Sequence, residues 1–218
     1  MAMAGENIVN GLAALLIVTS LLVIEANHPK RAALLYGVQS FVLVSVFAAL
    51  AFFSGAKELY LWAFSSFITK TILVPTILYL ALRRFDQIQP LPSSLTPPMA
   101  ITLAAVVLVV SAVIVTPIRL PGAAAFKPAL AVSLAHFFLG LACIITHRNI
   151  LKQIFGYCLM ENGSHLTLAL LANQAPELVE IGIATDAIFG VAVMTFLATR
   201  IQAQLHSFDD RELMTLKG

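Results

Sequence analysis

The sequence alternates long apolar runs with short polar segments. Seven of these runs contain about 20 predominantly apolar residues each, the length that an α-helix needs to cross a hydrocarbon core roughly 30 Å thick. We expect membrane-spanning helices at residues 8–24, 32–53, 59–82, 99–116, 128–145, 150–172 and 178–199. Most connections between them are short and polar and contain Pro or Gly, which interrupt helices. The pattern predicts an all-α polytopic membrane protein of seven transmembrane helices.

One connection differs from the others, because residues 87–98 (QIQPLPSSLTPP) form a proline-rich linker. It divides the chain into helices one to three (1–86), a segment with the linker and helix four (87–127), and helices five to seven with a short cytoplasmic tail (128–218). A shift of 119 residues superposes four pairs without a gap: His28/His147, Gly37/Gly156, Glu58/Glu177 and Thr76/Thr195. The sequence leaves open whether the first and last three helices are a parallel repeat.

The composition of the chain excludes several classes of protein function. Hydrophobic residues make up 60% of the chain and charged residues 11%, against roughly 45–50% and about 25% in soluble domains. A formal charge of +2 offers no basic surface for nucleic acid. The 2 cysteines, Cys143 and Cys158, lie in apolar runs, which excludes an iron-sulfur or zinc site with four cysteines of this chain alone. Without a phosphate-binding glycine loop, a zinc-binding HExxH or a nucleophile triad, we expect a chain that is not an enzyme by itself and binds no cofactor or metal.

The distribution of basic residues predicts the orientation in the membrane. No basic residue precedes the first apolar run, so we do not expect a signal peptide. Nine Lys and Arg residues fall on one set of termini and loops and three on the other, the latter being Lys57, Arg119 and Lys127. By the positive-inside rule, the N-terminus faces the outside or periplasm and the C-terminus the cytoplasm.

Four ionisable residues lie far from either end of their predicted helices. At 1.5 Å per residue, Lys70, His136, Glu161 and Asp186 lie roughly 16, 12, 15 and 12 Å into their spans. A charged group at that depth costs about 2.5–3.5 kcal/mol even on the most lenient scale. We therefore expect these side chains to face one another, a partner subunit or water.

The densest polar cluster is GYCLMENGSH in the sixth run, where Glu161 and His165 lie four residues apart on one helical face. Lys70 has no acidic neighbour in its own run, so its counter-ion must come from Glu161, Asp186 or another subunit. We take Glu161, Asp186, Lys70, His165 and His136 as candidates for a proton path. The alternative is that these side chains only hold helices together, as buried polar groups in membranes often do.

The segment HRNILKQIFGYCLMENGSH, followed by APELVEIGIATDAIFGVAVM, resembles component E of hydrogenase-4. That family contains membrane subunits of group 4 nickel-iron hydrogenase and formate hydrogenlyase complexes. The likeness extends over the whole chain, including FITK, KPALAV and the terminal TLKG. The last three helices are also similar to the K subunit of respiratory complex I, which carries two buried glutamates. Here Cys158 stands at the first of those positions, Glu161 follows one turn later, and Asp186 stands at the second.

The resemblance implies a noncatalytic subunit of the bacterial inner membrane that links redox chemistry to proton translocation. The nickel-iron centre and the iron-sulfur clusters would belong to partner subunits. The expected partners are antiporter-like subunits, a membrane subunit that anchors the hydrogenase, peripheral hydrogenase subunits and lipid, but not nucleic acid. Two alternatives stay open, a K-like subunit of a multisubunit sodium/proton antiporter and a non-conducting scaffold.

Overall fold

The computed structural model describes residues 2–83, 95–118, 124–172, 177–205 and 207–209. These residues form helices with the following bounds: α1 (Ala2–Glu25), α2 (Pro29–Ser54), α3 (Glu58–Ser66), the π-helix η1 (Phe67–Leu73), α4 (Val74–Arg83), α5 (Pro97–Val115), the 3₁₀ turn η2 (Ala124–Phe126), α6 (Lys127–Thr146), α7 (Ile150–Leu171) and α8 (Glu177–Leu205). Within the described ranges the chain forms no strand, only an isolated bridge between Asn149 and Asp209. The prediction of an all-α protein is confirmed.

Each of the seven predicted runs is helical, with ends that differ by a few residues from those expected. The third run is one continuous rod made of α3, η1 and α4. Six of these segments in the described part of the chain are long and apolar enough to cross a membrane: α1, α2, the α3–α4 rod, α5, α6 and α8. α7 has a similar length but is more polar, because it contains Lys152, Glu161 and His165. Lys152 and His165 are buried inside the bundle, which explains how such a helix fits among apolar ones.

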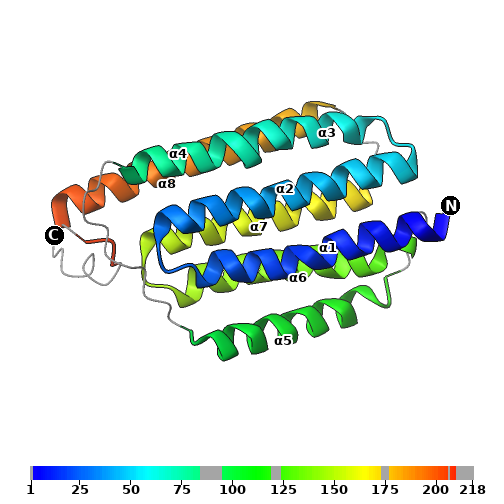
Figure 1. Ribbon diagram of the computed structural model, residues 1–218, viewed down its shortest axis with the longest axis horizontal. Helices are drawn as coiled ribbons and strands as arrows, with labels where there is room; N and C mark the ends of the chain where they lie inside the picture. The colour runs from blue at the N-terminus through cyan, green and yellow to red at the C-terminus, as the bar shows by residue number, and fades with distance from the viewer. Residues whose placement is uncertain (1, 84–94, 119–123, 173–176, 206, 210–218) are drawn as a thin grey trace.

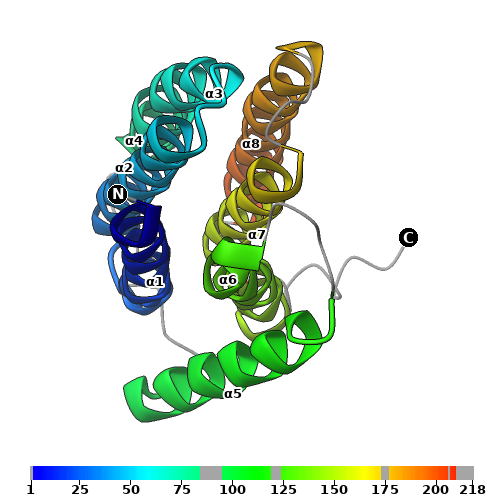
Figure 2. The same ribbon diagram turned by 90° about the vertical axis from the view of Figure 1, so that its right-hand side faces the viewer.

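The helices form two layers with α5 along one edge (Figures 1 and 2). One layer contains α1, α2 and the α3–α4 rod, and the other contains α6, α7 and α8. α1 contacts α6, α2 contacts α7 and α4 contacts α8. This is the arrangement that a parallel repeat of three helices would produce, although the repeat itself stays a prediction. Most of the proline-rich linker falls outside the described residues.

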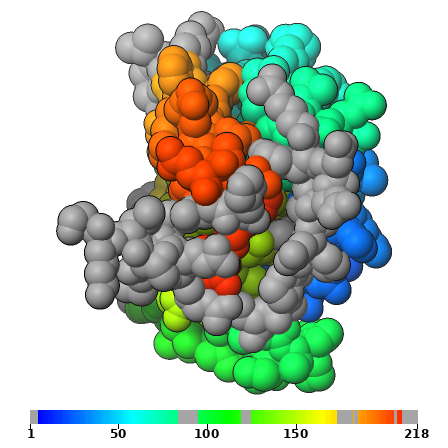
Figure 3. Space-filling model, turned by 90° about the vertical axis from the view of Figure 1, so that its left-hand side faces the viewer, coloured from blue at the N-terminus to red at the C-terminus, as the bar shows by residue number. Residues whose placement is uncertain are grey.

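The N-terminal end of α1 and the C-terminal end of α8 lie at opposite ends of the bundle (Figure 1). The view of the C-terminal end in Figure 3 shows the last turns of α8 in orange and red, with α5 in green below.

Local sequence explains where the helices begin and end. α2, α5 and α6 each have Pro in the first turn, where its missing N–H is not needed and its φ already suits a helix. α2 ends at Gly55, whose φ of 71° is a left-handed conformation that glycine adopts without a Cβ clash. α7 begins after Asn149, whose side chain accepts a hydrogen bond of 2.9 Å from the Leu151 N–H.

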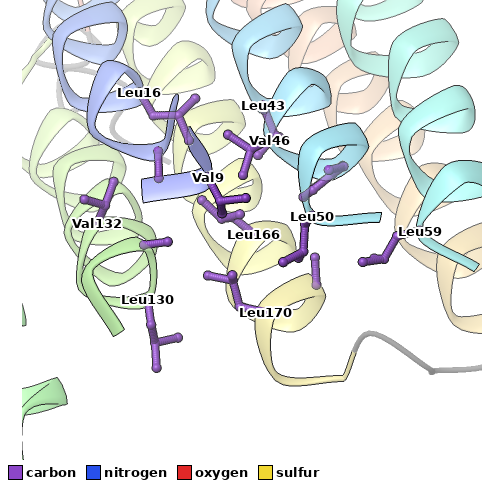
Figure 4. Close-up of a cluster of buried hydrophobic side chains, with 14 of the residues drawn as sticks. Val9, Leu16, Leu43, Val46, Leu50, Leu59, Leu130, Val132, Leu166 and Leu170 are labelled. Carbon is purple, nitrogen blue, oxygen red and sulfur yellow. The ribbon is translucent and has the colours of Figure 1, made fainter. Parts of the chain in front are cut away.

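Close packing of α6 on α7 holds the second layer together. A Cβ added to Gly163 would lie 2.5 Å from the backbone N of Phe137 in α6, and one added to Gly156 would lie 2.9 Å from the Gly140 carbonyl oxygen. Small residues of this kind let membrane helices approach closely. Nearby, a cluster that includes Leu16 and Leu166 fills the space between α1, α2, α6 and α7 (Figure 4). This packing fixes the position of the polar side chains of α7.

Candidate functional site

Lys70 lies in the middle of the π-helix η1, where its side chain is fully buried. The helix changes from α-helical to the wider π-helical hydrogen bonding just before Pro75. Proline has no N–H to donate to the Thr71 carbonyl, and its ring would clash with that carbonyl in a regular α-helix. Instead, the Val74 N–H bonds to the Thr69 carbonyl, five residues back. Short π-helical segments are frequent at functional sites. Sequence reasoning missed this segment, although a proline inside an apolar run was a signal for it.

The ammonium of Lys70 pairs with Glu161 across the two layers. Lys70 Nζ donates to Glu161 Oε1 at 2.5 Å and to Asn162 Oδ1 at 3.0 Å. The Lys70 side chain is 0% exposed and that of Glu161 13%. Of the counter-ions that the sequence left open for Lys70, the structure selects Glu161.

From this ion pair, hydrogen bonds lead into the bundle. Asn162 Nδ2 donates to Gln39 Oε1 of α2 at 2.8 Å. Gln39 Nε2 lies 3.1 Å from His136 Nε2 of α6. All three side chains are buried. His136 is therefore joined to Lys70 through two amide side chains.

The hydrogen bonds continue from His136 to α1. His136 Nδ1 lies 2.8 Å from Ser20 Oγ, which donates to the Leu16 carbonyl at 2.5 Å. With the proton of the imidazole on Nδ1, every donor from Lys70 to Ser20 points the same way. We call Lys70, Asn162, Gln39, His136 and Ser20 the polar chain. Sequence reasoning missed Gln39 and Ser20, although both are polar residues inside apolar runs.

Glu161 lines a cavity of about 320 Å³ on the other side, between α7 and α8. Its lining residues are Tyr157, Met160, Glu161, Ser164, His165, Leu168 and Asp186. The candidates therefore fall into two groups that meet at Glu161. Lys70 and His136 belong to the polar chain, and His165 and Asp186 belong to the cavity.

His165 is buried in an aromatic setting. Its ring centroid lies 4.8 Å from that of Phe47 and 5.3 Å from that of Trp62. Both ring nitrogens are buried and have no hydrogen-bond partner within the described part of the chain. His165 and Glu161 share the cavity wall, but no hydrogen bond joins them there. Asp186, in contrast, lies on an exposed part of α8.

A second polar cluster lies where α1 and α6 end and α7 begins. Lys152 is buried and donates to the Ile24 carbonyl, and His147 Nδ1 lies 3.0 Å from the Cys143 carbonyl oxygen. Burial lowers the pKa of His147 below its usual 6.5, the hydrogen bond to the Cys143 carbonyl opposes this, and the nearby Lys152 charge lowers it further. Sequence reasoning counted Lys152 only as one of the nine basic residues on one side of the membrane, and it did not predict that this lysine is buried.

The site is suited to proton exchange. The Glu161 carboxylate contacts a buried ammonium on one side and a cavity on the other. A carboxylate in that position can take a proton from water in the cavity while the ammonium stabilises its charged form. No cluster of three or more His, Cys, Asp or Glu side chains that could hold a metal occurs in the ranges that the structure describes.

Comparison with known proteins places the chain. It is 52% identical over 216 residues to "Hydrogenase-4 component E" of Escherichia coli (strain K12), a match that covers 99% of this chain and 100% of that protein. The proteins of the same description from Escherichia coli O157:H7 and Shigella flexneri match with the same identity and coverage. The chain belongs to the hydrogenase-4 component E family. This confirms the resemblance found in its sequence.

The family model for NADH-ubiquinone/plastoquinone oxidoreductase chain 4L matches residues 128–218 of this chain. That region holds α6, α7 and α8, with His136, Glu161, His165 and Asp186. Lys70, Gln39 and Ser20 lie outside it, so the site joins the region similar to chain 4L to the preceding helices. No solved structure matches the chain significantly.

Proposed function

We propose that this chain is a noncatalytic membrane subunit of a hydrogenase complex related to complex I, and that its buried ionisable residues link redox chemistry in partner subunits to proton translocation. Membership of the hydrogenase-4 component E family and the match to chain 4L support this assignment. The observation that carries the mechanism is the buried Lys70–Glu161 pair, which lies between the polar chain and the cavity.

In this mechanism, Glu161 is the group that gains and loses the proton. Lys70 Nζ stabilises the ionised carboxylate at 2.5 Å. When the carboxylate accepts a proton from the cavity, the ammonium loses its counter-ion but keeps its bond to Asn162. The remaining positive charge then polarises the polar chain toward His136. A change of charge in a neighbouring subunit would shift the equilibrium between the ionised and the protonated form of Glu161.

The nickel-iron centre, the iron-sulfur clusters and the hydrogen chemistry belong to partner subunits in this proposal. The chain lies in the bacterial inner membrane beside antiporter-like subunits and the subunit that anchors the hydrogenase. It crosses the membrane seven times, with its N-terminus outside and its C-terminus in the cytoplasm. A periplasmic reporter enzyme fused after Gly218 should be inactive, and one inserted between Arg119 and Lys127 should be active. The reverse pattern would refute this orientation.

The substitution Glu161→Gln tests the mechanism, because it keeps the volume of the side chain and removes its charge. We expect the complex to assemble and its proton translocation to fall by at least about tenfold, less than the roughly 10²–10⁴-fold that a positioned acid–base group typically contributes. His136→Gln, which alters the polar chain without touching Glu161, should also reduce translocation. Ser45→Ala is the control, since the exposed Ser45 hydroxyl bonds only within α2, to the Phe41 carbonyl. If the Glu161 variant assembles and translocates protons like the parent, the chain is a scaffold.

A further inference from the structure

Asp186 of α8 has no ion-pair partner within the described residues, which indicates a missing neighbour. Asp186 lies on an exposed part of the helix, and exposed apolar side chains follow it toward the C-terminal end of α8. Phe189 is 66% exposed and Val193 is 53% exposed. A face of this kind belongs against lipid or another helix, but a carboxylate at that depth costs about 2.5–3.5 kcal/mol in lipid. The carboxylate therefore requires a polar partner that covers this face of α8.

The cavity beside Asp186 shows which chemistry that partner has. Its polar lining holds two carboxylates, those of Glu161 and Asp186, together with the Ser164 hydroxyl, the His165 imidazole and the Tyr157 hydroxyl, the last of which can donate one hydrogen bond. The Ser164 hydroxyl already donates to the Met160 carbonyl, so only its lone pairs are free. His165 is 2% exposed and neither ring nitrogen has a partner in the described structure. A basic side chain suits the carboxylates and the acceptor nitrogen of His165, because lysine and arginine only donate hydrogen bonds and carry the opposite charge.

That basic side chain comes from a different polypeptide. Among the described residues, the cation at this depth is Lys70, which is fully buried and already bonded to Glu161 and Asn162. A second copy of the chain would therefore present no free ammonium at this depth. We propose that the face of α8 around Asp186 docks a transmembrane helix of another subunit, and that a Lys or Arg of that helix enters the cavity and pairs with Asp186.

This inference rests on the proposed function for the existence of a membrane complex. It adds that the proton site is completed at the subunit interface. With the basic residue in place, the cavity holds two acids, Glu161 and Asp186, each with its own cation. A proton arriving at the cavity from the neighbouring subunit would then meet Asp186 before Glu161.

Charge reversal in the intact complex tests the proposal. Asp186→Lys places two like charges together, so we expect recovery of the other membrane subunits with this chain to fall at least tenfold. Asp186→Asn, which keeps the shape, should reduce recovery less. Phe189→Asn, which places an uncharged polar group on the same docking face, should reduce recovery less than Asp186→Lys does. Replacing the partner's basic residue by Glu should restore assembly of the Asp186→Lys complex. An Asp186→Lys complex that assembles like the parent would overturn the proposal.

A second measurement does not depend on the stability of the variants. A photo-reactive phenylalanine analogue at position 189 should cross-link to a membrane subunit, within about two helical turns of a Lys or Arg. The same analogue at Phe52 on α2, which is 71% exposed, is the control for another face. Cross-links from position 189 to lipid alone, or to a segment without a basic residue, would refute the pairing. Proton translocation by Glu161→Gln reports on the proposed function separately, because neither cross-linking nor recovery of subunits measures it.

Discussion

Replacing Lys70 by Met should destabilise the protein strongly, because it leaves Glu161 without a counter-ion inside the bundle. Met keeps the length of the side chain and removes the ammonium. The Lys70 side chain is 0% exposed and that of Glu161 13%, so solvent screens their interaction only slightly. Breaking a buried pair by removing one partner costs about 3–5 kcal/mol. At roughly 2–4 °C per kcal/mol for a chain of this size, the melting temperature should fall by about 6–20 °C.

The double variant Lys70→Met/Glu161→Gln separates the ion pair from general packing. The Gln side chain needs no counter-ion, so the double variant should regain at least half of the lost melting temperature. Thermal unfolding of the detergent-solubilised complex, followed by the loss of this subunit from the complex, gives the four values of the double-mutant cycle. A coupling below about 0.5 kcal/mol, the limit for independent sites, would refute the direct Lys70–Glu161 contact.

Three further predictions concern the helices around the site. Gly163→Ala should lower the free energy of unfolding by about 1–3 kcal/mol, because the new Cβ would meet the Phe137 backbone. Gly11→Ala should instead stabilise α1 by up to about 1 kcal/mol, because nothing lies within 4 Å of the new Cβ. The melting temperatures of the two variants check both expectations. The lowered pKa of His147 means that the unfolded chain binds a proton first as the pH falls, so stability should decrease below about pH 6.5; melting curves of His147→Asn should lack this part of the pH dependence. Asn149→Ala removes the hydrogen bond to the Leu151 N–H and should cost about 1 kcal/mol, which melting curves also measure; no change would mean that this cap does not support α7.

The helices could be predicted from the sequence because each apolar run is long and ends in clear signals. Pro29 and Pro97 mark helix starts and Gly55 marks a helix end, all within three residues of the expected boundaries. The widened segment η1 was not predicted, because hydrophobicity alone does not distinguish i→i−5 from i→i−4 hydrogen bonds. The layering of α1–α4 against α6–α8 depends on contacts between segments more than 100 residues apart, which the pattern of one chain does not contain.

The ionisable members of the site could be found in the sequence because charge at membrane depth is costly. That reasoning selected Lys70, Glu161 and Asp186 and required a counter-ion for Lys70. It did not find Gln39 and Ser20, because a neutral polar residue in an apolar run costs less free energy in the membrane than a charged one and so does not require a partner. It also counted Lys152 only as one of the nine basic residues that set the orientation, and a lysine two residues after the start of the run 150–172 gave no indication of burial. Only the packing of α1 on α7 shows that its ammonium reaches the Ile24 carbonyl.

The most direct test of the central claim is the number of protons translocated per hydrogen molecule turned over by the reconstituted complex in sealed vesicles. The parent complex and the Glu161→Gln complex should be compared at equal subunit content. We expect the ratio to fall at least about tenfold in the variant, because the carboxylate that contacts Lys70 no longer exchanges a proton. An unchanged ratio in a fully assembled variant would contradict the assignment of Glu161 to proton translocation.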